Sequence, residues 1–581
     1  MFDIVISGGL VYDGTGSEPV RTDVGINGDT IATVGTNLGE AHQIIDATGC
    51  IVTPGFVDIH THYDGQATWD PMLAPSSING VTSAVIGNCG VGFAPAHPDK
   101  HDWLISLMEG VEDIPGAALV EGLRWNWESF GEYLDALEGQ ERTIDIASYV
   151  PHAPLRAYVM GQRGADPDEI PTDDELTDMA AIVADGMANG AVGFATSRTY
   201  VHRTKTGDHI GTFTAENREV IALGSVLRSA GRGVVQLISD AYQSHDEQYT
   251  LSELQLMRDV SIAAGRPLAM TVQQPIDLPD RWREMFAFIA DANENGAQMH
   301  AQVAPRPIGV LLGLAATVNP FAFCPSFGAL FMLSAAEKAA RMVEPELRAA
   351  VVEEHKALNL DGIAAHLTGA FHRMFSLTHP VNYEPDPTNS VAGLACAAGV
   401  DPVEMCYDLI MANEGQNMLY LPLYNYAKGN LDDTREMLVS DDALIALSDA
   451  GAHCGAICDG TFPTTLLAHW GRDRSHGDQI PLPYLVHLHT QRNAEYIGWR
   501  DRGVLAHGYL ADVNVIDMNT LNLAPPFIVH DLRAGGRRLM QTSTGYRYTI
   551  KRGQITFIDG VHTGALPGRL VRGDQPTPVA V

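Results

Sequence analysis

The sequence predicts an α/β protein, with a barrel of parallel strands in the middle of the chain and a small β-domain assembled from its two ends. Three patterns lead to this prediction. Units of helix, glycine and strand repeat through the middle, short alternating strands occur at both ends, and the repeat is lost over one long internal stretch.

The repeating units are clearest around residues 172–195. Thr172 and Glu175 form a capping-box pattern at the start of a helix, and apolar residues then recur at helical spacing up to Gly190. A buried-strand run follows at 191–195, and the same order recurs at 230–238 and 263–272. Repeated helix–strand units indicate a parallel sheet, and their number favours a barrel over an open sheet.

Both ends of the chain read as short strands separated by turn residues. The expected strands are residues 3–6, 23–26, 30–34 and 43–46 at one end, and 511–517 and 550–555 at the other. We therefore expect one composite β-domain from residues 1–53 and 503–581, and a catalytic barrel from 54–502. The repeat is lost between about 279 and 385, which we interpret as a helical insertion or lid on the barrel.

Composition narrows the class of protein. The chain has 581 residues, of which 45% are hydrophobic and 19% charged, so a folded globular protein is expected. A formal net charge of −34 argues against nucleic acid and membrane partners, but it says little about the substrate, because a local pocket can carry the opposite charge. Seven cysteines, no visible signal peptide and no long apolar run predict a cytoplasmic protein with free thiols.

A metal site is predicted at His60-Thr61-His62, which follows a strand-like run. Residues i and i+2 of a strand share a face, so both imidazoles can reach one ion. The ends of barrel strands are also where active sites sit. The alternative is a pair of ordinary polar histidines in a loop.

Several motifs together resemble the amidohydrolase superfamily, most closely its N-acyl-D-amino-acid deacylase (D-aminoacylase) branch. They are PGFVDIHTH (54–62), GVT (80–82), GNCG (87–90), SDAG (448–451) and GVLAHGYLAD (503–512), in the family's order along nearly the whole chain. The resemblance implies a distorted (β/α)₈ TIM-like barrel with a small β-sandwich made from both termini. It also implies hydrolysis of an amide C–N bond by metal-activated water.

Two further residues complete this predicted metal site. Cys89 lies at the end of the expected second barrel strand, where a thiolate would be a soft metal ligand, and the matching family cysteine ligates or bridges the metal. Asp449 ends the expected last strand and, in the family, acts as general base and then acid and can touch the metal. The alternatives are a small buried apolar residue for Cys89 and a helix cap for Asp449.

The chain departs from the family on the fifth and sixth strands. Where the deacylases carry two further metal histidines, those strands read VVQLISD (234–240) and AMTVQQ (269–274), with no histidine. We therefore expect an atypical member with one divalent metal ion, zinc, held by His60, His62, Cys89 and Asp449. Gln236, Gln273 or Gln274 would then orient the substrate.

Other residues are candidates for contacts with the substrate. His152 follows a strand at a barrel-top position, and Arg198 with Tyr200, or Arg306, could bind a substrate carboxylate. Any one of five loop histidines could replace a missing ligand, although a surface or core role is the simpler reading of each; these are His202, His209, His366, His372 and His453.

Three functions stay open at this point. The leading prediction is hydrolysis of an N-acyl amino acid or a similar small amide. The second is hydrolysis of a cyclic amide, lactone or ester on the same site. The third is a catalytically degenerate barrel that binds a ligand or partner, which the two missing histidines suggest. A homo-oligomer is compatible with all three.

Overall fold

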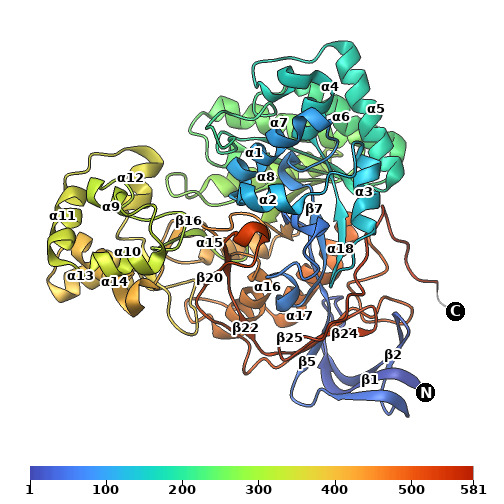
Figure 1. Ribbon diagram of the computed structural model, residues 1–581. Helices are drawn as coiled ribbons and strands as arrows, with labels where there is room; N and C mark the ends of the chain where they lie inside the picture. The colour runs from blue at the N-terminus through green and yellow to red at the C-terminus, as the bar shows by residue number, and fades with distance from the viewer. Residues whose placement is uncertain (580–581) are drawn as a thin grey trace.

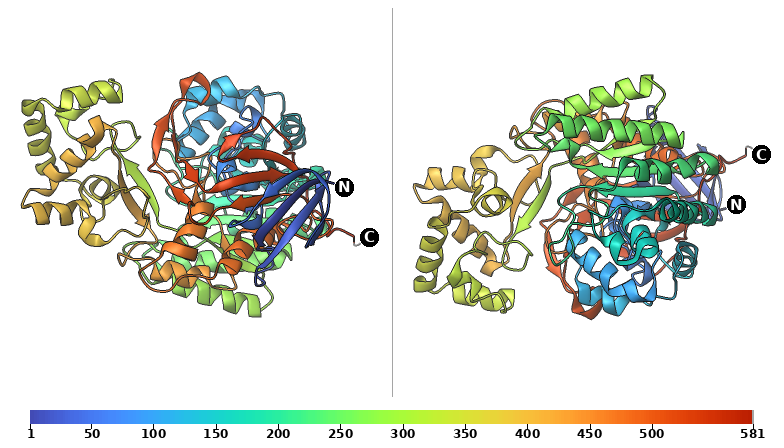
Figure 2. Two further views of the ribbon diagram at one scale, coloured as in Figure 1. Left: turned by 90° about the horizontal axis from the view of Figure 1, so that it is seen from below. Right: turned by 90° about the horizontal axis from the view of Figure 1, so that it is seen from above.

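The computed structural model describes residues 1–579 and confirms the predicted fold class: a (β/α)₈ barrel, a β-rich domain and a helical lobe (Figure 1). The barrel lies at the centre, the strands of both termini pack at one end of it, and the lobe projects to one side (Figures 1 and 2). The N-terminal strands and the described part of the C-terminal segment lie on the same side of the molecule.

Eight parallel strand positions form the barrel wall. They are β6 (Phe56–Asp58), β7 (Val81–Ile86), β8 (Asp145–Ser148) continued by β9 (Val150–Pro151), β10 (Gly193–Arg198), β11 (Val234–Ser239), β12 (Leu268–Thr271), β13 (Met299–Val303) and β17 (Ala443–Ile445). Hydrogen bonding follows the orders β6-β7-β8 and β17-β13-β12-β11-β10-β9. A parallel bridge between Thr61 and Ala450 closes the wall between its first and last strands.

Helices follow most of these strands on the outside of the barrel. They are α1 (His101–Glu112), α2 (Gly116–Gly122), α3 (Phe130–Glu138), α4 (His152–Met160), α5 (Asp173–Asn189), α6 (Asn217–Ala230), α7 (Glu247–Ala264), α8 (Arg281–Glu294), α15 (Asp432–Leu438), α16 (Phe462–Thr465), α17 (Leu482–His487) and α18 (Asn493–Ile497). Helix α5 carries the predicted capping box: the Thr172 side chain accepts from Glu175 N–H, and Gly190 ends the helix in a left-handed conformation.

One nine-stranded sheet joins the two ends of the chain, as predicted. It contains β1 (Phe2–Val11), β2 (Val20–Asn27), β3 (Thr30–Gly35), β4 (Ala41–Asp46), β5 (Ile51–Pro54), β18 (Val513–Ile516), β23 (Tyr546–Lys551), β24 (Gln554–Ile558) and β25 (Val561–His562). Strand β5 is the junction, because it pairs with β1 on one side and antiparallel with β18 on the other. Two small pairs accompany the sheet: β19 (Asn522–Leu523) with β22 (Ser543–Thr544), and β20 (Phe527–Val529) with β21 (Arg538–Met540).

The expected strand at 550–555 is a hairpin. Lys551 pairs with Gln554 across a turn, and Gly553 has φ +69° in that turn. A Cβ on Gly553 would lie 1.9 Å from the Gly28 carbonyl oxygen, so this tight turn needs glycine.

The helical lobe lies between barrel strands β13 and β17. It contains β14 (Ile308–Leu312), β15 (Phe375–Ser376), β16 (Leu419–Tyr424), α9 (Pro325–Gly328), α10 (Ala335–Met342), α11 (Pro345–Lys356), α12 (Gly362–Gly369), α13 (Val391–Ala398) and α14 (Pro402–Gly415). A hydrophobic cluster of its own, with Phe321 and Tyr407 among its members, fills the lobe. The lobe differs from the expected insertion at 279–385 at both ends. Helix α8 and strand β13 continue the barrel, while α13, α14 and β16 belong to the lobe.

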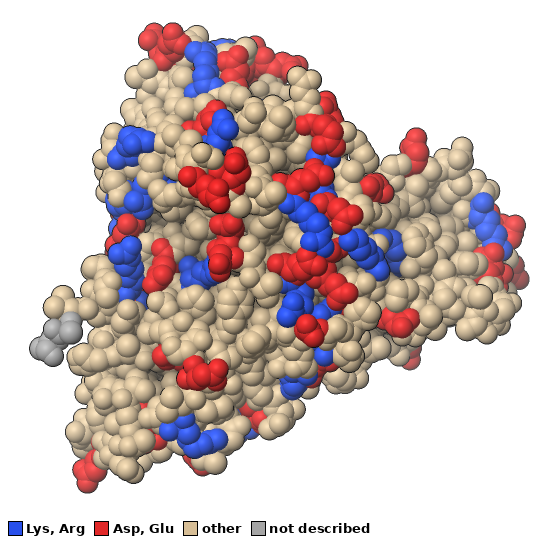
Figure 3. All heavy atoms as spheres, turned by 180° about the vertical axis from the view of Figure 1, so that it is seen from behind, with Lys and Arg blue, Asp and Glu red and all other residues tan. Residues whose placement is uncertain are grey.

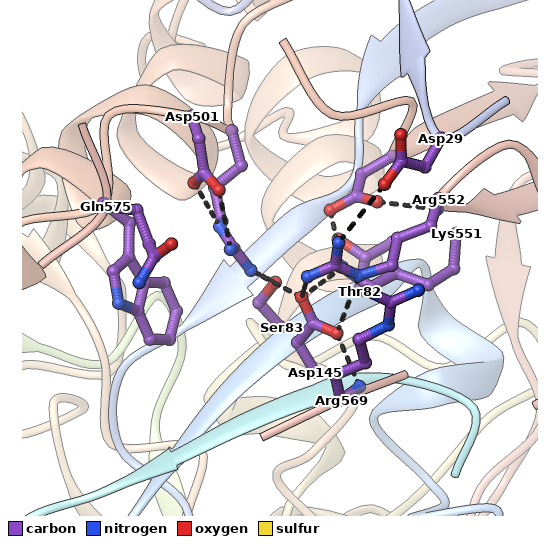
Figure 4. Close-up of polar contacts among 12 residues, drawn as sticks. Asp29, Thr82, Ser83, Asp145, Asp501, Lys551, Arg552, Arg569 and Gln575 are labelled. Atoms are coloured by element: carbon purple, nitrogen blue, oxygen red, sulfur yellow. Dashed lines mark hydrogen bonds and ion pairs between the residues drawn. The ribbon is translucent and has the colours of Figure 1, made fainter. Parts of the chain in front are cut away.

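A buried ionic cluster fastens the β-rich domain and the C-terminal segment to the barrel (Figure 4). The carboxylate of Asp145, on β8, lies 2.7 Å from Arg502, 2.8 Å from Lys551 and 3.1 Å from Arg552, and accepts a hydrogen bond from the Arg569 backbone. Burial alone would raise the pKa of the Asp145 carboxyl, but these cations outweigh burial and hold it below its ordinary value.

Charged side chains of both signs lie next to one another on one face of the molecule (Figure 3). On the face of Figure 3, acidic side chains alternate with basic ones, and the described residues form no broad basic patch there. Among residues 1–579, no helix is long and apolar enough to cross a membrane.

Candidate metal centre and active site

Three predicted ligands meet at the ends of the first two barrel strands. His60 and His62 follow β6, and Cys89 lies in the turn after β7. One ligand atom from each lies within 4.8 Å of the others, and all three side chains are buried. Two neighbouring strands thus place both imidazoles and the thiol around one point.

Asp449 reaches the same point from the end of the last barrel strand. Its Oδ1 atom lies 3.3 Å from His60 Nε2 and 3.7 Å from His62 Nε2, and His60 Nε2 lies 3.4 Å from Cys89 Sγ. In a tetrahedral zinc site with bonds of 2.0–2.3 Å, neighbouring ligand atoms are about 3.3–3.6 Å apart. Asp449 Oδ1 is also buried without a hydrogen-bond partner among the described residues. His60, His62 and Cys89 could therefore hold one divalent cation, and Asp449 lies beside this group.

Side-chain hydrogen bonds from Ser448 and Asp58 hold the two strand ends together behind these ligands. The Ser448 hydroxyl donates to Asp58 at 2.6 Å, and Asp58 in turn accepts the His60 backbone N–H. Cys89 and Asp449 have φ of 57° and 45°, a left-handed conformation that costs non-glycine residues energy. Such strain is typical of functional positions, where the surrounding structure fixes the side-chain direction.

The protonation states suit metal binding. Burial lowers the pKa of His60, and burial together with the nearby His60, His453 and His202 lowers that of His62 well below its ordinary value. Neutral imidazoles keep a lone pair free for a metal ion. Burial raises the pKa of the Cys89 thiol, with Glu112 and Asp449 adding to the effect, and a bound cation would reverse this by stabilising the thiolate.

Comparisons with known proteins identify the family of this chain. The model of the amidohydrolase family matches residues 43–557. The chain belongs to the amidohydrolase family. This amidohydrolase is therefore a metal-dependent hydrolase of carbon–nitrogen bonds, and its predicted resemblance to the D-aminoacylase branch is confirmed.

Two related proteins match the sequence of this chain, one over nearly its whole length and one over about a third of it. An uncharacterized protein of Mycobacterium tuberculosis (strain ATCC 25618 / H37Rv) is 26% identical over 609 residues, covering 99% of this chain and 96% of the relative. D-aminoacylase of Alcaligenes xylosoxydans xylosoxydans is 35% identical over 200 residues, which are 34% of this chain and 38% of that enzyme.

Solved structures share the fold of this amidohydrolase. A D-aminoacylase studied for its binuclear metal centre has a TM-score of 0.64 at 23% identity, over 98% of this chain and 100% of that one. An N-acyl-D-glutamate deacylase from Bordetella bronchiseptica, complexed with zinc and a phosphonate inhibitor, has a TM-score of 0.62 at 22% identity, over 98% and 99%.

Of the glutamine on strand β11 and the two that follow strand β12, two keep a free polar atom. Gln236 Oε1 accepts the Cys89 backbone N–H at 2.7 Å, and its Nε2 is buried without a partner among the described residues. Gln273 Oε1 is likewise buried and unpartnered within residues 1–579. Gln274 is used structurally: its side chain contacts Asp433 and the backbone of Ala427.

Two of the predicted substrate contacts, His152 and Arg198, are held by other side chains of the protein. His152 is fully buried, with Nδ1 2.8 Å from Thr196 and Nε2 2.9 Å from Glu219. Arg198 pairs with Glu253 through both carboxylate oxygens.

Tyr200 is 48% exposed. It lines a cavity of about 390 Å³ together with Ile363 and His366, both from lobe helix α12.

The guanidinium of Arg306 is already bound by other side chains of the protein. It lies 2.7 Å from Asp459, bonds Thr461 and Thr465, and packs over the Tyr383 ring at 3.8 Å. A substrate carboxylate would have to compete with Asp459 for this guanidinium.

Two of the five loop histidines lie in the neighbourhood of the metal centre. His453 Nε2 lies 3.8 Å from Glu112, and His202 is buried with Nδ1 3.1 Å from Ser197. His209 stacks on Phe213, and His366 lines the cavity beside Tyr200. His372 lies in the lobe, between α12 and β15.

Sequence reasoning missed two residues that lie behind the two histidines predicted to bind the metal. Gln302, on β13, places Oε1 2.7 Å from His60 Nδ1. Glu112, the last residue of α1, places Oε1 3.4 Å from His62 Nδ1. No local motif marks either residue. The sequence offers one weak signal for each. Gln302 is a polar residue within a short, largely apolar run, and Glu112 is an acidic residue at the C-terminal end of a helix, where the helix dipole disfavours negative charge.

Proposed function

We propose that this amidohydrolase hydrolyses the amide bond of an N-acylated amino acid or a similar small amide, with one zinc ion held by His60, His62, Cys89 and Asp449. The observation that carries the proposal is the spacing of ligand atoms, 3.3–3.7 Å between Asp449 Oδ1 and the two histidine Nε2 atoms. Bound there, a divalent cation supplies a Lewis acid that polarises a carbonyl and lowers the pKa of water to about 7.

Asp449 is the proposed proton carrier of the reaction. Its side chain is 22% exposed, whereas His60 and His62 are 1–2% exposed, so Asp449 is the ligand that faces incoming substrate and water. A carboxylate in that position takes a proton from the attacking water and then donates it to the leaving amine.

Gln236 and Gln273 are proposed to bind the substrate amide. Gln236 offers a free N–H donor and Gln273 a free carbonyl acceptor, each buried and unpartnered within the described chain. A substrate amide needs one donor and one acceptor, and buried polar groups left unpaired cost about 1–3 kcal/mol each. A productive substrate would satisfy both side chains.

The test is release of free amine from N-acetyl amino acids of both stereochemical series, before and after removal of metal with a chelator. We expect activity that is lost with the metal and restored by zinc. Full activity in the stripped protein would contradict the metal-dependent mechanism. Cyclic amides, lactones and esters belong in the same panel, since preferential turnover of those compounds would replace the proposed substrate class.

Elemental analysis separates an enzyme from a degenerate binding barrel. We expect about one zinc per chain, lost in a His60→Ala/His62→Ala double variant. Glu109→Gln is the matched control. Glu109 lies on helix α1, pairs with Lys205 and, among the described residues, forms no ion pair with a proposed ligand. A protein without stoichiometric metal in its wild-type form would favour the degenerate barrel.

A further inference from the structure

Glu112 is a buried carboxylate without a compensating cation. Its side chain is only 2% exposed, and within residues 1–579 its ion-pair partners are two histidines, His62 at 3.4 Å and His453 at 3.8 Å. It is the last residue of α1, where the helix carbonyls add negative potential. Burial raises the pKa of the Glu112 carboxyl well above its ordinary value, and Asp449 and Asp64 add to the effect, so the ionised form of Glu112 needs a cation nearby.

The orientation of His62 points to that explanation. Its Nε2 faces Asp449 Oδ1 at 3.7 Å, and its Nδ1 faces Glu112 Oε1 at 3.4 Å. The two nitrogens of an imidazole point in different directions, so a ring that offers Nε2 to the metal point offers Nδ1–H to Glu112. Both His62 Nδ1 and Glu112 Oε1 are buried without a hydrogen-bond partner in the described part of the chain.

His60 shows the same arrangement with a different acceptor. Its Nε2 lies 3.3 Å from Asp449 and 3.4 Å from Cys89 Sγ, while its Nδ1 lies 2.7 Å from Gln302 Oε1. Each metal histidine is therefore backed by a side-chain oxygen, an amide for His60 and a carboxylate for His62. Such outer partners fix the imidazole tautomer and increase the basicity of the ligand.

We infer that Glu112 is a positioning residue for the metal centre: it accepts Nδ1–H from His62, fixes the ring with Nε2 toward the metal and contributes negative charge beside the cation. The inference rests on the metal-dependent function proposed above. Closure of the His62–Glu112 pair from 3.4 Å to a charge-assisted hydrogen bond needs a shift of about 0.6 Å.

The experiment compares zinc affinity in three variants by competition with a chromophoric chelator. Glu112→Met keeps the approximate size but removes the acceptor, and we expect affinity to fall about 10–100-fold. Glu112→Gln keeps a neutral acceptor and should lie between that variant and the wild type. Glu109→Gln, on the same helix but paired with Lys205, should match the wild type.

A second readout separates positioning from a general loss of structure. Cobalt(II) substituted for zinc reports ligand geometry through its visible absorption, and we expect a changed spectrum in Glu112→Met and partial recovery in Glu112→Gln. Circular dichroism and the thermal midpoint check that each variant is folded. Should Glu112→Met fail to fold, Glu112→Gln decides: wild-type affinity and an unchanged cobalt spectrum would overturn the role of Glu112.

The two proposals fail in different ways. A wild-type protein that binds neither zinc nor cobalt would overturn the metal-dependent function itself. A wild type that binds both ions, with a folded Glu112→Met variant of equal affinity and identical spectrum, would overturn only the inference about Glu112.

Discussion

The side-chain oxygen of Gln236 accepts a hydrogen bond from the backbone N–H of Cys89 at 2.7 Å. A residue of β11, the fifth barrel strand, therefore stabilises the turn that carries the proposed thiolate ligand. Cys89 is held there with φ 57°. A hydrogen bond to the turn backbone favours this strained conformation over relaxed alternatives. The glutamine therefore has a structural role on the strand where the resemblance to the deacylases leads us to expect a metal histidine.

Restoring both strand histidines should restore a second metal position. In a Gln236→His/Gln273→His variant we expect the zinc content to rise from about one to about two per chain, because two imidazoles would be added on strands next to the proposed site, one of them beside Cys89. Elemental analysis after gel filtration measures the ratio. Gln298→His is the control. Gln298 directly precedes strand β13, at the end of the barrel away from the proposed site, and this variant should still bind one ion. A double variant that still binds one ion would show that glutamine is not what limits the stoichiometry.

Asp449→Asn should remove proton transfer. We expect kcat/KM to fall about 10²–10⁴-fold, because an amide cannot accept the proton of the attacking water. Steady-state kinetics with the best N-acyl substrate gives the ratio. Asp441→Asn, an exposed residue just before the other end of the same strand, should keep wild-type activity. Retention of more than a tenth of the activity in Asp449→Asn would argue for a different base.

Cys89→Ser should weaken zinc binding selectively. A thiolate is a soft ligand that favours zinc, whereas a hydroxyl stays protonated and binds poorly, so we expect at least a tenfold loss of zinc affinity. Chelator competition measures it, and Cys396→Ser, at the exposed cysteine of α13, is the matched control. Equal zinc affinity in Cys89→Ser and wild type would exclude the thiol from the ligand set.

Asp145→Asn should destabilise the junction between the barrel and the β-rich domain. The variant leaves Arg502 and Lys551 buried with one carboxylate fewer, and we expect the free energy of unfolding at pH 7 to fall by about 3–5 kcal/mol. Urea unfolding measures the change. Asp501→Asn touches the same arginine from a partly exposed position and should cost about 0–1 kcal/mol.

The contribution of Asp145 should also depend on pH. Its pKa is lowered in the folded protein, so its stabilisation is fully present above the unfolded-state pKa of about 3.9 and is lost as pH falls below that value. The difference in thermal midpoint between wild type and Asp145→Asn should be constant from pH 7 to 5 and shrink below about pH 4. A difference that grew on acidification would contradict this assignment.

Features set by nearby residues were predictable from the sequence. His60 and His62 share one strand face, and Thr172 with Glu175 fixes the start of α5 through contacts only three residues apart. Cys89 and Asp449 were found because each ends a recognisable strand within a motif. The structure then brings both to His60, at 3.4 and 3.3 Å.

Features set by distant contacts were not predictable in the same way. Glu112 is 50 residues from His62 along the chain, on a helix whose apolar spacing says nothing about which carboxylate turns inward. Strand β13 was assigned to the insertion because Pro305 and Pro307 follow it closely and interrupt the barrel repeat. Only its pairing with β12 and β17 shows that it is the seventh strand.

The pairing of β5 with β18 has a consequence for how the chain is made. Strand β5 ends at Pro54 and β18 begins at Val513. At about 5–20 residues per second, a ribosome takes roughly half a minute to a minute and a half to cover that distance. During synthesis the first strands therefore wait with one edge unpaired, and an open edge is a site where chains associate wrongly. The edge of β5 that later pairs with β18 is thus exposed for most of the time that the chain is being made.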